Sequence, residues 1–418
     1  MSVNVLDEGI LPPQLTTVRD LDLLSVTTSG PDPQAAYARL QEQWGMVAPV
    51  EIEPGVPAWL VMGHPEICAI ARDETNYSRD PRNWRWHRDG LLAADAAILA
   101  YCPPEPRNAS FHHDGETRAR LRQALDDALA ALPEKAVVEY ADTVCTRIIG
   151  ELPDSGPLDL VADYGVKVGF LSMAAVFGFD HATATRLMAD SMIISKLLPG
   201  ALEARQRIGQ VLMEHVRSRR GTPGRDLTTL MADHPGLESD LEVIDSIAVP
   251  VHGAASFVGA FISRTLHLLV ADARFAERWG RGRLHVDEAL DEVLWRDTPV
   301  PNAPAPRFAM VDHELDGKLV RAGDAIVLAV SAANHDPRVH TGDPWDEVGN
   351  RSHLAWSLGP HACPAPRQAR LITRTAVQRV LRDLDVHLAV SQQEIRWAPS
   401  PWARHPVSLP VNYHRRAG

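Results

Sequence analysis

The residues from Trp356 to Cys363, which read Trp-Ser-Leu-Gly-Pro-His-Ala-Cys, constrain the fold of this chain more than any other feature. They place one cysteine in a turn, after an aromatic residue, a glycine and a histidine, and before a basic, helix-compatible run that reaches Arg370. Backbone N–H groups in such a turn, and the N-terminus of the following helix, stabilise a thiolate. An isolated cysteine is more often an inert buried thiol. The presence of Gly359 and His361 beside it favours a thiolate that serves as the proximal ligand of a haem iron.

The composition is that of a globular protein whose main partner is not nucleic acid. The 418 residues carry 42 basic and 54 acidic side chains, a net charge of −12, whereas phosphate binding requires a basic field. Residues 1–8 show no basic region followed by an apolar run, so we expect no signal peptide. The cysteines are scattered without paired spacing, which predicts free thiols in a reducing cytoplasm. They are Cys68, Cys102, Cys145 and Cys363.

The longest apolar stretch covers residues 247–262 and contains Pro250 and His252. It is too short and too polar for a membrane span, so we expect a buried core helix. Pro250 removes one helix hydrogen bond and predicts a kink near His252.

Helical periodicity dominates the chain, and strand-like runs cluster near its two ends. The pattern predicts one large, mainly α domain with small β-sheets (α+β) over residues 31–418, preceded by a loosely structured segment, residues 1–30. Helices are expected over residues 33–44, 64–74, 115–132, 135–152, 158–177, 183–198, 201–219, 225–233, 240–272, 286–296 and 365–384. Strands are expected in a hairpin over 46–62, at 307–311 and 325–330, and in the tail over 386–411. The aperiodic segment 77–113 is long enough to predict a functional loop.

These motifs resemble the bacterial cytochrome P450 family over nearly the whole chain from residue 33 onward. The family's cysteine loop has an aromatic residue, Gly, His, Cys, Gly and Ala-Arg at the positions that hold Trp356, Gly359, His361, Cys363, Ala365, Ala369 and Arg370. Tryptophan replaces the usual Phe, and Ala365 replaces the usual Gly. Residues 114–122, 298–300, 306–308 and 332–337 resemble further family segments. The resemblance implies the cytochrome P450 fold and haem b (iron protoporphyrin IX), with Cys363 as the metal ligand.

The resemblance also implies which side chains hold the two haem propionates. Carboxylates need cations or strong donors. The matching positions are Arg122 and Arg118 on the helix over 115–132, Arg307 on the strand and His361 in the cysteine loop. Arg118 stands where the family often has histidine.

Two departures from the family pattern concern the helices around the haem. The first lies in residues 286–296, where most members have Glu-x-x-Arg and this chain has Glu292 and Trp295. A buried glutamate without its partner is destabilising by about 3 kcal/mol. Arg296, four residues on, and Arg351, just before the cysteine loop, are the candidates to compensate. A subgroup of actinobacterial members carries tryptophan at this place, where it can also serve as core packing.

The second departure lies in the helix expected to cross the haem. Many members carry Ala-Gly-x-acid-Thr there, and the acid and the alcohol deliver protons to dioxygen. Here Ala255 replaces the acid, and Ser256 keeps a hydroxyl that we expect to hydrogen-bond dioxygen. His252 has three possible roles, which the sequence leaves open: a distal iron ligand or gate, a proton donor that replaces the acid, or a histidine hydrogen-bonded in the helix core.

The tryptophan-rich segment 84–89 lies, by resemblance, in the loop that covers the haem. Trp84 and Trp86 either line a pocket for a hydrophobic substrate or anchor the long loop by packing.

The resemblance implies a haem-thiolate monooxygenase of the kind found in actinobacterial secondary metabolism. It would insert one atom of dioxygen into a small, mostly apolar molecule. Its electrons would come from a ferredoxin and a ferredoxin reductase, with the ferredoxin docked near Arg120, Arg367 and Arg370. Two alternatives stay open: a peroxide-driven haem-thiolate enzyme, and a haem-binding sensor or complex component with little turnover.

Overall fold

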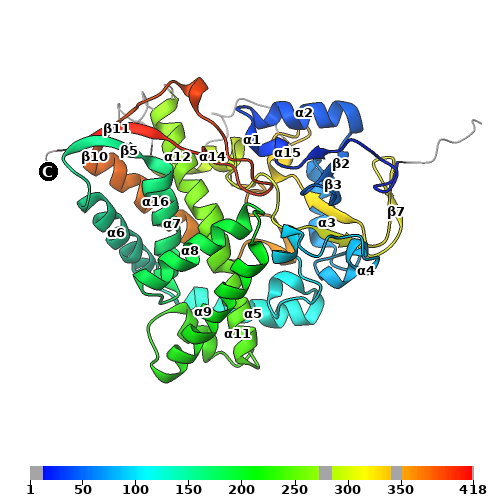
Figure 1. The fold of residues 1–418 in the computed structure, drawn as a ribbon, viewed down its shortest axis with the longest axis horizontal. Helices are drawn as coiled ribbons and strands as arrows, with labels where there is room; N and C mark the ends of the chain where they lie inside the picture. The colour runs from blue at the N-terminus through cyan, green and yellow to red at the C-terminus, as the bar shows by residue number, and fades with distance from the viewer. Residues whose placement is uncertain (1–12, 273–284, 340–350, 417–418) are drawn as a thin grey trace, which may run out of the picture.

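The computed structural model of the protein describes residues 13–272, 285–339 and 351–416. Helices form most of it, and Figure 1 shows α11 and α12 running through the middle of the molecule. The longer helices are α2 (Pro33–Trp44), α3 (His64–Arg72), α5 (Gly115–Ala131), α6 (Glu134–Gly150), α7 (Val166–Val176), α8 (His181–Ser195), α9 (Ala201–Gly221), α11 (Asp240–Gly253), α12 (Gly259–Ala271), α14 (Val286–Arg296) and α16 (Pro366–Asp383). The shorter ones include α1 (Val26–Ser29), α4 (Arg85–Arg88), α10 (Leu227–Ala232) and α15 (Val330–Asn334).

Three sheets accompany the helices. The largest has the strand order β1-β2-β3-β9-β6-β4, and its hairpin of β2 and β3 pairs Val47 with Val61, as the sequence predicted. A three-stranded sheet, β10-β11-β5, lies at the opposite end of the molecule in Figure 1, and β7 and β8 form a separate pair. The strands are β1 (Asp22–Leu23), β2 (Val47–Glu51), β3 (Pro57–Val61), β4 (Tyr77–Ser78), β5 (Ser155–Asp159), β6 (Arg307–Ala309), β7 (His313–Leu315), β8 (Lys318–Val320), β9 (Ala325–Leu328), β10 (Leu384–Leu388) and β11 (Pro410–Arg415).

Local chemistry explains where several elements begin and end. Pro33 begins α2 behind Asp32, whose side chain accepts a hydrogen bond from the Gln34 N–H at 2.9 Å. Proline is favoured in the first turn because its missing N–H would have no helical partner there. Gly45 ends α2 with a φ of +81°, a conformation that glycine adopts without steric cost. The predicted bounds of α2 and α14 are confirmed.

Other predictions need correction. The segment 158–177 is not one helix: it begins in β5 and continues through the π-helical segment η4 (Leu160–Gly165) before α7. The Asp159 side chain accepts a hydrogen bond from the Val161 N–H, so helical geometry starts at Leu160 instead of at Leu158. Strands occupy only the two ends of the tail, in β10 and β11.

The predicted loose structure of residues 1–30 is wrong for the residues that the structure describes, 13–30. Leu15 and Leu24 are buried, and Leu23 pairs with Glu51 of β2. The Thr28 hydroxyl donates to the Ser400 carbonyl oxygen at 2.6 Å. Residues 1–12 lie outside the described residues.

The central helical run, Asp240–Ala271, comprises α11, the π-helical segment η5 (Ala254–Val258) and α12. By length and hydropathy alone it could cross a membrane, but 71% of its most apolar window is buried inside the protein. Burial of this kind is typical of a core helix, as predicted for residues 247–262. Pro250 stands inside α11, and the helical geometry changes to π a few residues beyond it.

Candidate active site

Cys363 lies in a tight turn between the 3₁₀ segment η7 (Gly359–His361) and α16. Its backbone N–H donates to the Trp356 carbonyl oxygen at 2.8 Å. Gly359 has a φ of +71°, and a side-chain carbon there would collide with the carbonyl oxygen of Ala71 in α3. The loop therefore requires glycine at this position.

The environment of the Cys363 thiol suits a metal ligand. Burial raises the pKa of the thiol, while a hydrogen bond from the Ala365 N–H and the charge of Arg122 act in the opposite direction. Ala365 is the N-cap of α16, so the helix N-terminus faces the sulfur as expected. A coordinating metal ion deprotonates such a thiol, and the nearby positive groups stabilise the thiolate.

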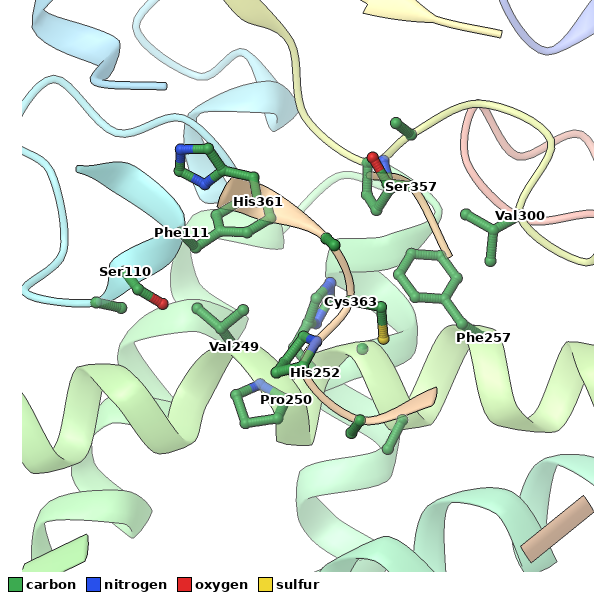
Figure 2. A pocket seen from close by; sticks show the side chains of 18 of the residues that line it. Ser110, Phe111, Val249, Pro250, His252, Phe257, Val300, Ser357, His361 and Cys363 are labelled. Atoms are coloured by element: carbon green, nitrogen blue, oxygen red, sulfur yellow. The ribbon is translucent and has the colours of Figure 1, made fainter. Parts of the chain in front are cut away.

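Cys363 borders a cavity with mainly apolar walls, shown in Figure 2. The central helical run forms one wall, and Val300 and the loop before α5 contribute others. Lining side chains labelled in the figure are Ser110, Phe111, Val249, Pro250, His252, Phe257, Val300, Ser357, His361 and Cys363. An apolar cavity beside a buried thiol has the character that a haem and an organic substrate require.

His252 lines this cavity and is anchored by Tyr101. Its Nε2 lies 2.9 Å from the Tyr101 hydroxyl oxygen, and the two rings pack edge to face with centroids 5.1 Å apart. Burial, with a smaller contribution from Arg107, lowers the pKa of His252 to about 3, so the ring is neutral at physiological pH. Its Nδ1 is buried and has no hydrogen-bond partner among the described residues. The bond to Tyr101 agrees with the expected hydrogen-bonded histidine, although the partner lies in a loop instead of in the helix, and the unpartnered Nδ1 leaves the proton-donor role open as well.

Ser256 does not line the cavity. It is buried, and its hydroxyl donates to the His252 carbonyl oxygen within the helix at 3.5 Å. The segment η5 explains this placement, because the wider π-helical turn changes which residues face the haem side. Phe257 faces the cavity instead (Figure 2). The geometry therefore does not favour the predicted contact between Ser256 and dioxygen. The sequence did not predict Phe257 as a lining residue, because a π-helical turn leaves no recognisable sequence pattern.

The four side chains predicted to hold the propionates gather around the cysteine loop. Arg122 lines the cavity and donates from Nη1 to the Ala362 carbonyl oxygen at 2.8 Å. Arg118 lies 3.5 Å from the Pro360 carbonyl oxygen. Arg307 donates from Nη2 to the Ala71 carbonyl oxygen at 3.2 Å, on the strand side of the same loop.

Two carboxylates, which the sequence did not indicate as part of the site, lie beside these cationic side chains. His361 Nε2 lies 3.1 Å from Glu74 Oε1 and 3.3 Å from Asp114 Oδ1, and Arg118 Nε lies 2.7 Å from the same Glu74 oxygen. Burial is the largest single influence and raises the pKa of both carboxyls, but His361 together with Arg118 at Glu74, and with Ser78 and the Arg79 N–H at Asp114, outweighs it, so both pKa values are lowered. Asp114 stands at the N-cap of α5 but makes no capping bond, because its carboxylate accepts from the Ser78 hydroxyl and the Arg79 N–H instead.

Arg79 is a further cation that sequence reasoning missed. Arg79 and Arg307 are 8% and 3% exposed, and neither forms an ion pair with a described residue. Burial, and then the charge of Arg79, lowers the pKa of Arg307 to about 9. Arg79 donates to the Ala305 carbonyl oxygen at 2.6 Å. Two buried guanidinium groups without carboxylate partners are costly unless a ligand neutralises them, so this corner fits the propionates of a haem.

Of the two candidates to compensate for the departure in α14, one pairs with Glu292. Glu292 pairs with Arg296 at 2.6 Å, which confirms the predicted compensation. The other candidate, Arg351, lies 3.5 Å from Asp291. Arg370 of α16 also pairs with Asp291, which is 8% exposed. Trp295 packs edge to face against His353, with ring centroids 5.5 Å apart.

The tryptophans of segment 84–89 anchor the loop and do not line the cavity. Trp84 is fully buried and stacks on Phe308 of β6 with ring centroids 5.5 Å apart. Trp86 is 6% exposed and packs under the Arg85 guanidinium. Of the two interpretations that the sequence left open, loop packing is the one that the structure favours.

The predicted ferredoxin face also differs from expectation. Arg120 forms ion pairs with Glu242 and Glu238, and Arg370 is engaged with Asp291 and is largely buried. Arg367 has 71% of its side chain exposed, but it too forms an ion pair, with Glu134 of α6.

Comparisons with known proteins agree with this geometry. No protein-family model matches the sequence. The chain is 27% identical over 411 residues to 2-hydroxy-5-methyl-1-naphthoate 7-hydroxylase of Streptomyces carzinostaticus, covering 93% of this chain and 97% of that protein. It is also 27% identical to the cytochrome P450 monooxygenase PikC of Streptomyces venezuelae over 92% of both chains. The structure of CYP154C4 from Streptomyces sp. W2061 superposes with a TM-score of 0.83 at 22% identity, covering 94% of this chain and 98% of that one.

A partly buried cysteine at the start of a helix, beside an apolar cavity and a group of buried cations, is the arrangement that a haem-thiolate protein needs. The relatives and the structural neighbours are cytochrome P450s, whose cofactor is haem b, and the chain has the same fold. It is therefore an oxidoreductase with a single-domain cytochrome P450 fold.

Proposed function

We propose that the protein inserts one oxygen atom from dioxygen into a small, mostly apolar organic molecule. The observation that carries the proposal is the position of Cys363 beside a cavity with apolar walls. Haem, when bound, supplies the activation of dioxygen. The chain itself supplies the axial thiolate, the binding surface for the substrate and the exclusion of water.

The binding of the cofactor rests on two groups of side chains. Cys363 is the metal ligand, assisted by the Ala365 N–H. Arg122, Arg118, Arg307 and His361 are the proposed partners of the propionates. Glu74 and Asp114 hold His361 in place, Glu74 also pairs with Arg118, and Arg307 has no carboxylate partner among the described residues.

We assign His252 a role in proton delivery. Ala255 stands where the family has its acid, and the Ser256 hydroxyl is bonded within the helix. Burial raises the pKa of Tyr101 far above its usual value, so this hydroxyl keeps its proton. Because Nε2 of His252 accepts from the Tyr101 hydroxyl, the neutral ring carries its proton on Nδ1, which is free to donate a hydrogen bond to a water or ligand.

Electrons would come from a ferredoxin and its reductase in the cytoplasm. Arg367, at the start of α16 and close in sequence to Cys363, is exposed and pairs with Glu134, so an acidic partner on this face would bind it by replacing Glu134. The relatives act, by their names, on different compounds, among them a naphthoate, so the cavity of this chain must be probed directly.

Turnover with dioxygen and redox partners, compared with turnover with hydrogen peroxide alone, distinguishes the proposed monooxygenase from the two alternatives. With ferredoxin, reductase, NADPH and isotopically labelled dioxygen, we expect a product that carries one labelled oxygen atom. Turnover with hydrogen peroxide alone, and none with redox partners, would instead indicate the peroxide-driven enzyme. Haem retention without turnover under either condition would indicate a sensor or complex component.

His252→Ala separates the roles of this residue. We expect the ferric absorption spectrum to be unchanged and NADPH consumption to become uncoupled from product formation. A changed ferric spectrum would indicate that His252 ligates the iron, and unchanged coupling would remove it from proton delivery. Tyr101→Phe, which removes the hydroxyl at Nε2, should reproduce the uncoupling.

A further inference from the structure

Arg107 is a cation in the cavity that neither the cofactor nor the proton path uses. It lies in the loop before α5 and lines the same cavity as Cys363. The loop is fixed around it by histidines: the His113 ring lies 3.0 Å from the Arg107 carbonyl oxygen, and the His112 ring lies 2.8 Å from the Tyr101 carbonyl oxygen. The Arg107 backbone is therefore held in position by its neighbours.

The guanidinium of Arg107 has little to bind within the protein. Its Nη2 donates to the Ala100 carbonyl oxygen at 3.4 Å, and this is the only side-chain hydrogen bond that Arg107 makes to the described residues. An arginine has five N–H donors, so most of them remain available on the cavity side. Arg122, the other arginine that lines the cavity, is by contrast bonded to Ala362 and Asp126.

A second arginine, Arg205, adds to the positive charge near Arg107. Burial, and then the charge of Arg205 on α9, lowers the pKa of Arg107 to about 10, so Arg107 remains charged at physiological pH. Burial also lowers the pKa of Arg205. Asp245 of α11 is the carboxylate that acts on both, but it lies beyond ion-pair distance of each guanidinium. Its Oδ2 accepts from the Asn108 N–H at 2.8 Å and from the Asn108 side chain at 3.0 Å.

We propose that the substrate of this cavity is an organic acid, an apolar body with one carboxylate that pairs with Arg107. A guanidinium fork matches a carboxylate in shape and charge, and Arg205 adds a second positive charge behind it. The inference rests on the proposed function in one respect: the cavity beside Cys363 must be the substrate-binding site.

The position of the two arginines also orients the substrate. Arg107 lies in the loop before α5, and its charge interacts with both Asp245 and His252 of α11. With the carboxylate on Arg107, the apolar body would extend through the cavity toward Cys363, which lines the same cavity. The carboxylate acts as an anchor, and the oxidised carbon lies at the other end.

Matched ligands test the inference on the haem-loaded enzyme. The probes are dodecanoate, 4-phenylbutyrate and dehydroabietate, each with its uncharged methyl ester, titrated by calorimetry at neutral pH and physiological salt. We expect at least one acid to bind wild type about tenfold or more tightly than its ester, as a charge-assisted hydrogen bond implies. Esters that bind as tightly as their acids, or no binding by any of the acids, would overturn the inference.

Variants of Arg107 test whether this residue causes the preference for the acid over its ester. Arg107→Gln should remove the difference between acid and ester, and Arg107→Lys should keep some of it. Arg186→Gln, an exposed arginine on α8, is the matched control and should leave it unchanged. If Arg107→Gln keeps the preference for the acid, the assignment to Arg107 is wrong.

The CO-reduced spectrum of each sample is recorded first. A thiolate spectrum together with no preference for the acid rejects this inference and leaves the proposed function standing. Loss of the thiolate spectrum in wild type rejects the proposed function itself. If Arg107→Gln does not fold, the comparison of acid and ester on wild type still decides.

Discussion

Replacing Arg370 with leucine would remove the buried partner of Asp291 in α14. The side chains of this pair are 16% and 11% exposed, and Arg351, the remaining cation, is 64% exposed and lies 3.5 Å away. Removing one member of a buried ion pair destabilises a protein by about 3–5 kcal/mol. Because Arg351 still lies near Asp291, we expect a loss of stability near the lower end of this range, about 3 kcal/mol. At an unfolding entropy of about 2 cal/mol/K per residue, a chain of this size should lose about 3 °C in Tm.

Arg374→Leu is the matched control, one helical turn further along α16. Arg374 pairs with Asp287 at 3.1 Å, a carboxylate that Arg370 also contacts at 3.2 Å, and the side chains of Arg374 and Asp287 are both more than a third exposed. A pair of this exposure contributes about 0.5 kcal/mol, so Tm should fall by less than about 1 °C. Thermal unfolding is followed by far-ultraviolet circular dichroism on samples of equal haem content, because bound haem itself stabilises the folded state.

Asp291→Asn in the Arg370→Leu background completes the comparison. Removing the unpaired charge should recover at least about 1 kcal/mol, since an unpaired buried charge is more costly than a neutral amide. Equal shifts for Arg370→Leu and Arg374→Leu, or no recovery in the double variant, would refute the conclusion that Asp291 and Arg370 support this core.

Three further predictions concern the histidines, the cysteine loop and the central helix. Burial lowers the pKa of several histidines, His112 among them, well below the value of about 6.5 in an unfolded chain, so the unfolded state binds more protons and stability should fall as the pH decreases from about 6.5 to about 4. The pKa values are about 3 for His252 and His267 and about 4 for His353 and His405. Measured Tm should show this decline, and His405→Gln should make it shallower; a flat profile would speak against buried neutral histidines. Gly359→Ala should reduce haem retention on gel filtration and destabilise the protein by more than about 2 kcal/mol, because a side chain there meets the Ala71 carbonyl oxygen; wild-type retention would show that the loop tolerates a side chain. Ser256→Ala should change turnover by less than about threefold, since its hydroxyl bonds within the helix, and a loss of a hundredfold, typical of acid–base groups, would restore the role expected from the family.

The sequence predicted those features of this site that depend on neighbouring residues. Gly359, His361 and Cys363 lie in one continuous loop, so their spacing determines their geometry. The pair of Glu292 and Arg296 was predictable for the same reason, because i,i+4 neighbours share a helix face.

Interactions between distant segments were not predictable in this way. Asp291 and Arg370 meet because α14 and α16 pack together, and no local pattern encodes that contact. Ser256 was misplaced because a π-helical turn changes which residues face the cavity without leaving a recognisable sequence pattern. The role of Trp84 was ambiguous because aromatic residues in a loop serve equally well as pocket walls and as packing anchors.

The most direct test of the central claim, that Cys363 is the thiolate ligand of a haem, is the absorption spectrum of the reduced, CO-bound protein. Wild type should show the red-shifted Soret maximum of a cysteine-thiolate haem, and Cys363→Ser should lose it while the folded content measured by circular dichroism is retained. A wild-type Soret maximum at the position typical of histidine-ligated haem, or a thiolate spectrum that survives Cys363→Ser, would contradict the account.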